Sequence, residues 1–378
     1  MEKLPTEKLS ARALNRATLA RQMLLARERR GVLETVEFLG GLQAQVPNAS
    51  YTGLWTRLVD FDPEQLSALM TDRSVVRISA MRGTIHLLSA DDALSFRPLC
   101  QVVNDRGPFG KGAYRKALAG IEQADLVAAA RKLLEAEPLT NGRLGAALQQ
   151  AFPGYDGSTL AWAVRDSPLA LVQVPPRGLW GRSGAPTSTT AEHWLGRPLD
   201  PAPSVDRMVL RYLAAFGPAT VRDAQAWSGL TRLAEVFERL RPQLRTFLDA
   251  GSGRELFDLP DAPRPAEDTP APVRFLPDYD NVVLGYADRG RIITPEDQVR
   301  LGQLNRYLAA FLVDGRVRGA WSVAPAGPVP EVVVSGFTEL SAEEEQAVRE
   351  EAEKLLRFHR PDLTEWTVTV RMRADTGG

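Results

Sequence analysis

Two glutamines separated by a single residue, Gln43 and Gln45, are the side chains whose type and spacing best suit chemistry in this sequence. They follow Gly40-Gly41 and precede Pro47, so we expect a non-helical backbone there. On an extended backbone, side chains two residues apart point the same way, and two amide carbonyls could then hold one water molecule between them. The simpler alternative is that both amides cap the preceding helix or face solvent, because Gln-x-Gln is a very short motif.

Other kinds of chemistry find less support in the sequence. The single cysteine, Cys100, rules out an internal disulfide framework and a cysteine-rich zinc site. The three histidines, His86, His193 and His359, lie far apart, and no cluster of Asp, Glu and His indicates a metal-dependent nuclease. We therefore expect neither a metal nor an organic cofactor.

The elements around the glutamines have the order of a winged helix, in which several helices precede a two-stranded wing. Thr35 is placed to cap one helix, and Pro63 is favourable in the first turn of another. Two short strands follow around Met81-Arg82. The predicted elements are helices at 10–30, Val36–Leu42, 50–60 and 63–70, and strands at Val75–Ile78 and Gly83–Leu88.

The same order recurs twice. The second copy has three helices between 122 and 165, and its wing pairs Leu169–Val174 with Gly178–Gly181. The third copy is the clearest, because Thr220 caps its second helix and Gly229 closes it. Its elements are helices at Val205–Ala215, Val221–Ser228 and Leu233–Thr246, then a hairpin from Phe247 to Leu259.

A Pro-rich linker that we expect to be disordered, Pro260–Pro272, separates these copies from a C-terminal region of different pattern. Strands near 273–276, 315–322, 331–334 and 367–370 and a helix at Ala342–His359 predict a small β-rich subdomain. The predicted fold class is mainly α with β (α+β). The predicted units are 1–118, 119–200 and 201–262, each a winged helix, and the C-terminal subdomain 273–378.

Charge gives little support for nucleic-acid binding, since the net charge is −1 and DNA-binding domains usually carry a basic excess. Basic residues gather in 1–30, where eight Lys or Arg face three Glu, so any basic surface must be local. No apolar run approaches the roughly 18 residues of a membrane-spanning helix. The N-terminus also lacks the apolar region of a signal peptide. We expect a cytoplasmic protein that does not bind membranes and that associates with the nucleoid when bound to DNA.

The sequence resembles the AlkZ/YcaQ-type DNA glycosylases over nearly its whole length. The resemblance rests on Ala13–Gln22, Gly41–Gln45, Met81–His86 and Leu276–Asn281. It implies tandem winged helices in a C-shaped body. The family signature is glutamine, any residue, then glutamine or aspartate. Gln43 and Gln45 occupy those positions in the double-glutamine form of AlkZ, whereas YcaQ-like members carry aspartate at the second.

The resemblance implies a monofunctional glycosylase that removes N7-alkylated purines from double-stranded DNA. In the AlkZ branch this activity extends to unhooking interstrand crosslinks, as self-resistance to a DNA-alkylating natural product. Hydrolysis of an ordinary glycosidic bond usually takes two carboxyl groups, but a cationic N7-alkylguanine leaves as a neutral base without a proton donor. The carbonyls of Gln43 and Gln45 can place a water molecule and present partial negative charge to an oxocarbenium-like sugar. A crosslinked guanine cannot flip freely, so an open site is implied.

Eight further residues are candidate DNA contacts around the pair. A lone histidine in a strand, such as His86, is more often structural. Asp280 and Asn281 can equally form an Asx-turn that fixes their loop, and Trp180 fits either a probing hairpin or the core. The eight candidates are Asn48, Arg82, Thr84, His86, Asp280, Asn281, Arg289 and Arg291.

Two non-enzymatic alternatives remain at this point. A winged-helix DNA-binding regulator would share the winged helices and the basic N-terminal helix, and a protein-interaction scaffold would explain the near-zero net charge. Regulators usually carry one such unit and dimerise on two half-sites. Three units in one chain favour a monomer that wraps one duplex site, which suits an enzyme acting on one lesion.

Overall fold

The computed structural model describes residues 7–105, 116–302, 308–323, 329–362 and 364–372. Helices and strands are mixed along the chain, as predicted. The helices are α1 (Ala11–Arg21), α2 (Val32–Phe38), α3 (Ala49–Trp55), α4 (Pro63–Thr71), the 3-10 turn η1 (Met81–Gly83), α5 (Ala90–Asn104), α7 (Gln123–Ala136), α8 (Asn141–Ala151), α9 (Gly157–Asp166), α10 (Ala191–Leu195), α11 (Val205–Phe216), α12 (Val221–Ser228), α13 (Ala234–Leu240), η2 (Arg241–Gln243), α14 (Asn281–Leu284), α15 (Pro295–Leu301) and α16 (Ala342–His359).

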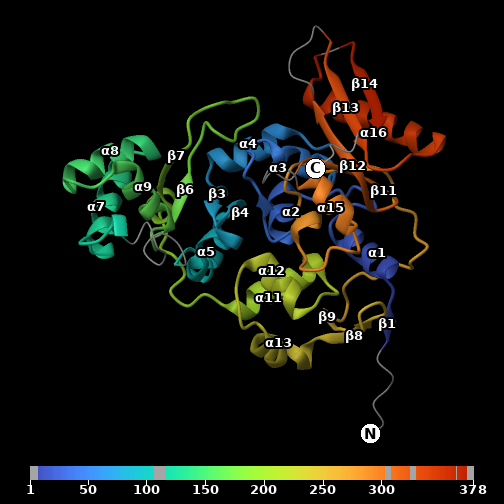
Figure 1. Cartoon of the computed structure of the whole chain (residues 1–378), viewed down its shortest axis with the longest axis horizontal. Helices are drawn as coiled ribbons and strands as arrows, with labels where there is room; N and C mark the ends of the chain where they lie inside the picture. Colours follow the sequence, from blue (N-terminus) through green and yellow to red (C-terminus); the bar gives the residue numbers. More distant parts are fainter. Residues whose placement is uncertain (1–6, 106–115, 303–307, 324–328, 363, 373–378) are drawn as a thin grey trace.

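The strands form three sheets, with orders β2-β4-β3-β6-β7-β5, β1-β8-β9 and β10-β11-β12-β13-β14. In Figure 1 the helices α7 to α9 lie at one end of the long axis, and the third sheet lies toward the other. The strands are β1 (Lys8–Leu9), β2 (Leu42–Gln43), β3 (Val75–Ser79), β4 (Ile85–Ser89), β5 (Leu139–Thr140), β6 (Leu171–Gln173), β7 (Thr187–Thr190), β8 (Arg245–Asp249), β9 (Glu255–Asp258), β10 (Arg274–Phe275), β11 (Ala310–Val313), β12 (Arg316–Val323), β13 (Glu331–Gly336) and β14 (Thr367–Met372).

The six-stranded sheet joins the first two predicted units. β3 and β4 form the antiparallel wing predicted around η1, with Ser79 opposite Ile85. β2 adds to the outer edge of β4. β6 pairs with the other edge of β3, where Arg77 lies opposite Gln173. The strands predicted as two separate wings are therefore parts of one continuous sheet.

Two predictions in this region are wrong. Leu169–Val174 does not pair with Gly178–Gly181, because β6 pairs with β7 and the intervening loop carries Trp180 onto the ring of Tyr51, 4.9 Å between centroids. The predicted helix Val36–Leu42 is also wrong, because α2 begins at Val32 and ends before the glycine pair. Gly40 and Gly41 have φ of 66° and 91°, which glycine adopts at little cost, and this turn lets Leu42-Gln43 join β4 as a strand.

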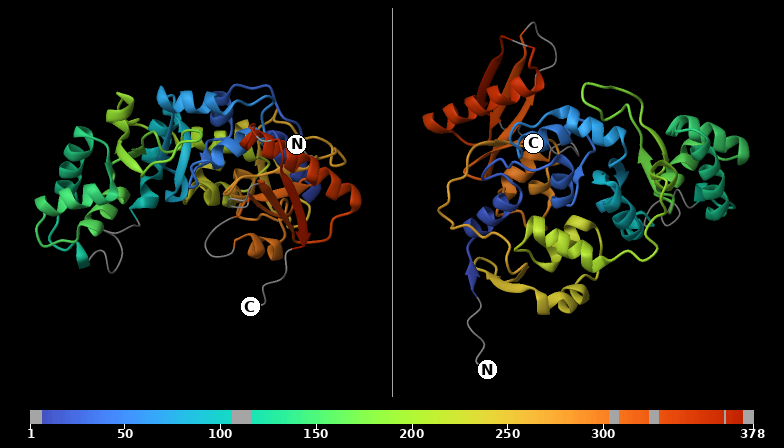
Figure 2. Two further views of the ribbon diagram at one scale, coloured as in Figure 1. Left: turned by 90° about the horizontal axis from the view of Figure 1, so that it is seen from above. Right: turned by 180° about the vertical axis from the view of Figure 1, so that it is seen from behind.

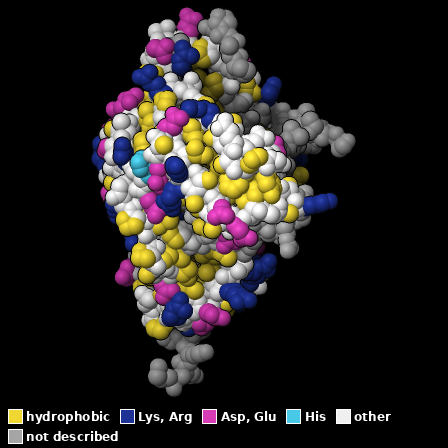
Figure 3. All heavy atoms as spheres, turned by 90° about the vertical axis from the view of Figure 1, so that its left-hand side faces the viewer, with side chains coloured by type: hydrophobic (Ala, Val, Ile, Leu, Met, Phe, Trp, Pro, Cys, Tyr) yellow, Lys and Arg dark blue, Asp and Glu magenta, His cyan; other side chains and the backbone are white. Residues whose placement is uncertain are grey.

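The helices α7, α8 and α9 form a lobe with a core of its own, which includes Leu126, Leu148 and Leu160. Thr140 caps α8, and Asp156 caps α9. Figure 2 shows this lobe standing apart from the rest of the chain. Figure 3 views the molecule from this end, where Lys or Arg, Asp or Glu and apolar side chains are interspersed. This face is therefore not a basic surface.

The elements α11, α12, α13, β8 and β9 follow the order predicted for 201–262. Thr220 and Asp223 form a capping box on α12, and Gly229 closes that helix in the left-handed conformation. The predicted third helix, Leu233–Thr246, is too long, because α13 ends at Leu240 and the 3-10 turn η2 follows. Pro242 accounts for this break, since proline has no backbone N–H to continue the hydrogen-bond ladder of the helix. β1 extends this hairpin, pairing in parallel with β8.

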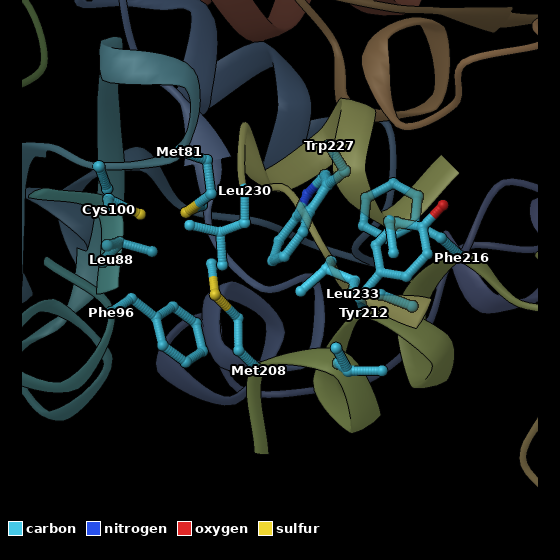
Figure 4. Close-up of a cluster of buried hydrophobic side chains, with 14 of the residues drawn as sticks. Met81, Leu88, Phe96, Cys100, Met208, Tyr212, Phe216, Trp227, Leu230 and Leu233 are labelled. Carbon is cyan, nitrogen blue, oxygen red and sulfur yellow. The ribbon is translucent and has the colours of Figure 1, made fainter. Parts of the chain in front are cut away.

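The largest hydrophobic cluster joins the six-stranded sheet to these helices. Phe96 and Cys100 of α5 lie with Met81 and Leu88 on one side, and Met208, Tyr212 and Trp227 of α11 and α12 on the other (Figure 4). The core therefore extends across the boundaries of the predicted winged-helix units.

The C-terminal region is the β-rich subdomain expected, with α16 running over the predicted residues and starting from the capping box of Ser341 and Glu344. The strand β11 was not predicted; it is a short buried apolar segment that forms a hairpin with β12. β13 and β14 pair in parallel. Apolar residues of α16 pack between this sheet and α2 to α4, including Leu355, Leu356 and Val348.

The basic N-terminal helix is held inside the molecule. Arg21 forms a bidentate ion pair with Asp258 at 2.6 and 2.8 Å, and both side chains are fully buried. Arg16 donates to the carbonyl of Thr269 at 2.6 Å, and Arg12 donates to the carbonyl of Glu267 at 2.8 Å. The linker 260–272 is therefore an ordered segment bound to α1, and its predicted disorder is wrong because it supplies the carbonyls that these guanidinium groups need.

Within the described ranges, no helix combines the length and the apolar character that crossing a lipid bilayer requires.

Candidate active site

The two glutamines lie where β2 leaves the six-stranded sheet. Gln43 is the last residue of β2 and pairs with His86 of β4. The amide N–H of Ala44 still donates to the carbonyl of Ile85 at 2.8 Å, after which the chain turns toward α3. Gln43 is buried, whereas Gln45 and Asn48 are exposed. The predicted extended, non-helical backbone is present through Ala44, and Gln45 begins the turn that leads out to solvent.

The Gln43 side chain is bound by an arginine. Arg82 Nη2 donates to Gln43 Oε1 at 2.6 Å, and Arg82 Nη1 donates to the carbonyl of Trp227 at the end of α12. Because guanidinium groups only donate, this contact fixes which end of the Gln43 amide is oxygen. Arg82 has φ of 56°, and a non-glycine residue in this conformation costs about 1–3 kcal/mol and persists where its surroundings impose it. Here η1 packs against α12.

His86 lies beside this pair and is neutral. Burial, with a smaller contribution from the positive charge of Arg82, lowers the pKa of His86 to about 3. Its Nδ1 is 3.0 Å from the carbonyl of Thr84, so Nδ1 carries the proton. A buried neutral imidazole does not offer a charge to a phosphate, and the structural alternative for His86 is favoured. Thr84 is partly buried, and its hydroxyl donates to Met81 O at 3.2 Å.

The opposite side of the glutamine segment meets a second arginine, which the sequence analysis did not select. Arg77 of β3 is 2% exposed, and its Nη2 donates to the carbonyl of Ala44 at 2.8 Å. Its Nε and Nη1 are buried without a hydrogen-bond partner among the described residues. Burial lowers the pKa of Arg77 to about 10, and the charge of Arg177 adds to this. Gln45 Oε1 accepts only a long bond, 3.4 Å from Ile85 N.

Asp280 and Asn281 are buried behind the segment rather than turned to a DNA surface. Asp280 forms a bidentate ion pair with Arg57, at 2.8 and 2.9 Å, and also caps α14. Asn281 Nδ2 donates to the carbonyl of Gly41 at 2.7 Å. These contacts support the backbone that leads into β2, as the Asx-turn alternative suggests, so this loop positions the glutamines from within the protein.

Arg289 and Arg291 differ in their surroundings. Arg291 is buried, stacks on Tyr286 at 4.2 Å and donates to Pro218 O at 2.9 Å, so its charge is not available at the surface. Arg289 is partly buried and lies close enough to Arg82 to lower its pKa, although burial is the larger cause. The structure thus brings Arg289 near Arg82 from a segment more than 200 residues away.

These features can be compared with known proteins. Residues 36–358, which include both glutamines and Asn281, match the model of a family described as DNA glycosylase AlkZ-like. The chain belongs to the AlkZ-like DNA glycosylase family. The resemblance inferred from the sequence is confirmed, and the chain is a DNA glycosylase, an enzyme that hydrolyses N-glycosyl bonds in DNA.

Two comparisons with individual proteins extend this result. A protein of Streptomyces sahachiroi named interstrand DNA cross-link repair glycosylase is 27% identical over 362 residues, which cover 90% of this chain and 94% of the relative. The solved structure of Streptomyces sahachiroi DNA glycosylase AlkZ superposes with a TM-score of 0.74 at 23% identity, covering 97% of this chain and 100% of that one. The second comparison shows a shared fold over the whole chain.

Of three further contacts at this AlkZ-like site, two could not be selected from sequence alone. Trp227 contributes only its backbone carbonyl, and Arg57 is one arginine among many. Arg77 does carry a signal, because it is the one charged residue within the apolar strand Val75-Val76-Arg77-Ile78. A charge at a buried strand position usually has a partner or a function.

Proposed function

We propose that this DNA glycosylase hydrolyses the N-glycosidic bond of cationic N7-alkylated purines in double-stranded DNA, with Gln43 and Gln45 as the catalytic residues. The observation that carries the proposal is the lack of an acidic side chain in contact with the glutamines in the described part of the chain. Among the described residues, no carboxylate forms a hydrogen bond or ion pair with Gln43, Gln45, Arg77 or Arg82. A site without a carboxylic acid cannot protonate a leaving base, so it suits a base that already carries the positive charge.

The reaction requires two things of the chain, and the Gln-Ala-Gln segment can offer both. An amide carbonyl accepts a hydrogen bond from water and holds it in line with the anomeric carbon. The partial negative charge of that carbonyl favours the cationic sugar in the transition state. The base departs neutral as its bond to the sugar breaks, and the water then bonds to that carbon and releases its proton to solvent.

We further propose that the enzyme unhooks interstrand crosslinks, as the name of its relative says of that protein. A crosslinked guanine stays tied to the opposite strand and cannot enter a closed pocket. The exposed side chain of Gln45 supports a site that a guanine can approach while it remains near the helix. The chain would act as a monomer on one lesion, with its winged-helix units at 1–118, 119–200 and 201–262 around the duplex.

The surface that contacts DNA must be local, since the arginines of the third helix predicted in the third unit are paired with acids. In α13 and the following turn, Arg239 is paired with Asp206, and Arg241 with Glu238 and Glu255. Cations already neutralised by acids release few counterions on DNA binding. Arg289, beside Arg82, and the exposed Asn48 near the glutamines are the candidate contacts that the geometry favours.

The test is excision from a duplex that contains a single N7-methylguanine, scored as strand cleavage at the abasic site. Gln43→Ala and Gln45→Ala should abolish excision while binding to the same duplex persists. Gln346→Ala, an exposed glutamine of α16, is the matched control and should excise at the wild-type rate. Full activity in both active-site variants would refute the assignment. A duplex with one N7–N7 guanine crosslink tests unhooking in the same assay.

A further inference from the structure

Two arginines hold the Gln-Ala-Gln segment from opposite faces of the sheet. In antiparallel pairs, directly opposed side chains share a face, and successive residues alternate. Gln43 is opposed to His86, which is opposed to Ile78. Arg77 is the neighbour of Ile78 in β3, so it lies on the other face. Arg77 reaches the segment through the backbone of Ala44, and Arg82 reaches it through the Gln43 side chain.

Burying the charge of either arginine costs free energy, because the guanidinium group loses its hydration. Neither forms an ion pair with an acid in the described ranges of the chain, and burial lowers the pKa of each to about 10. A buried charge usually has a carboxylate partner. Several other buried arginines of this protein do, including Arg21 with Asp258 and Arg57 with Asp280. The hydrogen bonds of Arg77 and Arg82 instead converge on one short segment.

We propose that Arg77 and Arg82 form an arginine clamp, a pair of positioning residues that fixes the Gln-Ala-Gln segment for catalysis. The inference rests on the proposed function. Arg82 donates a hydrogen bond to one lone pair of the Gln43 side-chain carbonyl and so fixes the direction of that amide group. Arg77 fixes the peptide between the two glutamines. The Gln45 carbonyl, with only its 3.4 Å contact to Ile85 N, is then the acceptor left for the attacking water.

The clamp also explains two special backbone positions. Gly178 packs on Arg77, and a Cβ there would lie 2.9 Å from Arg77 Cδ, so the loop between β6 and β7 leaves room for the guanidinium group. Gly229 packs on Arg82, and its Cβ would lie 3.1 Å from Arg82 Cα. Both glycines have positive φ. Each arginine is thus seated against a segment from a different predicted unit.

The experiment compares Arg77→Met and Arg82→Met with Arg97→Met. Arg97 of α5 is the matched control. Like Arg77 it is 2% exposed and donates to a single carbonyl, which for Arg97 is Ser167 O at 3.0 Å. The readouts are the single-turnover rate of N7-methylguanine excision at saturating enzyme, the Kd for the same duplex, and the thermal midpoint. Misplacement of reacting groups by about 1 Å costs on the order of 100-fold. We expect that loss in rate for both clamp variants with Kd unchanged, and none for Arg97→Met at a comparable fall in Tm.

Chemical rescue separates positioning from folding. Guanidinium ion at sub-denaturing concentration should restore excision in Arg82→Ala, where a space is left, but not in Arg82→Met. A wild-type rate in Arg77→Met and Arg82→Met, with Gln45→Ala inactive, overturns the clamp and leaves the proposed function intact. A weaker Kd with an unchanged saturated rate makes Arg82 a DNA contact and also overturns it. Full activity in both the Gln43 and Gln45 alanine variants overturns the proposed function itself.

Discussion

Replacement of Asp280 by alanine should lower the free energy of unfolding while leaving the affinity for duplex DNA unchanged. Asp280 and Arg57 are 1% and 0% exposed in their side chains and form two short hydrogen bonds. Removing one partner of a buried ion pair leaves the other charge uncompensated and costs about 3–5 kcal/mol. Asp280 also accepts from Val282 N as the cap of α14, which adds about 1 kcal/mol. The expected loss is about 4–6 kcal/mol, a large part of a typical folding free energy.

The assay is thermal and urea unfolding, with DNA affinity measured on the same preparations. For a large chain, each kcal/mol shifts Tm by roughly 2 °C, so Asp280→Ala should fall by about 10 °C. The double variant Arg57→Met/Asp280→Ala should be more stable than Asp280→Ala alone, because the stranded charge is removed with its partner. Asp362→Ala, which breaks an exposed pair with Arg360, is the control and should change stability by less than about 1 kcal/mol.

One result would refute this reasoning. If Asp280→Ala unfolds within about 1 kcal/mol of the wild type while its Kd for duplex DNA weakens tenfold (about 1.4 kcal/mol), Asp280 faces DNA after all. The buried ion pair would then contribute little to the fold. A loss of stability with an unchanged Kd supports the structural role.

Three more predictions follow from the site. The single-turnover rate should be flat between about pH 6 and 9, since amides do not titrate and His86, with its pKa lowered to about 3, stays neutral; a bell-shaped profile would contradict this. Because the folded pKa of His86 lies below its unfolded value of about 6.5, its stability contribution is complete above pH 6.5 and is lost as the pH falls toward 3. The contribution of His86 to the free energy of unfolding should be about 2 kcal/mol smaller at pH 5 than at pH 7. His86→Gln should remove that pH dependence. Gly178→Ala, at φ of 97° and against Arg77, should slow excision and lower Tm together; an unchanged rate would count against the clamp.

The sequence predicted local structure well where one segment carries its own signal. Thr220 and Gly229 marked helix ends that the structure confirms, because capping depends on residues within a single turn. The Gln-x-Gln segment could also be selected as candidate chemistry, although its role rests on family resemblance.

What the sequence could not predict depends on contacts between distant segments. The sequence analysis paired Leu169–Val174 with Gly178–Gly181, whereas β6 pairs with β7. The alternation of apolar and polar residues within one strand does not decide which other strand it pairs with. The basic residues of 1–30 suggested a surface, yet Arg16 and Arg21 are buried, because the carbonyl of Thr269 and the carboxylate of Asp258, each more than 230 residues away, accept their hydrogen bonds. Arg77 was missed for the same reason, since its partner is a backbone carbonyl.

The position of α1 has a consequence for how the chain folds as it is synthesised. β1 pairs with β8, Lys8 opposite Leu248, and Arg16 contacts Asp314, 298 residues later. At about 5–20 residues per second, a ribosome takes roughly 15–60 s to add that many residues. The helix that emerges first is therefore among the last to reach its native contacts. Until then the apolar residues Leu14 and Leu19 are exposed and can bind chaperones. A chain truncated before β8 lacks the strand and the later residues that α1 and β1 contact in the native fold.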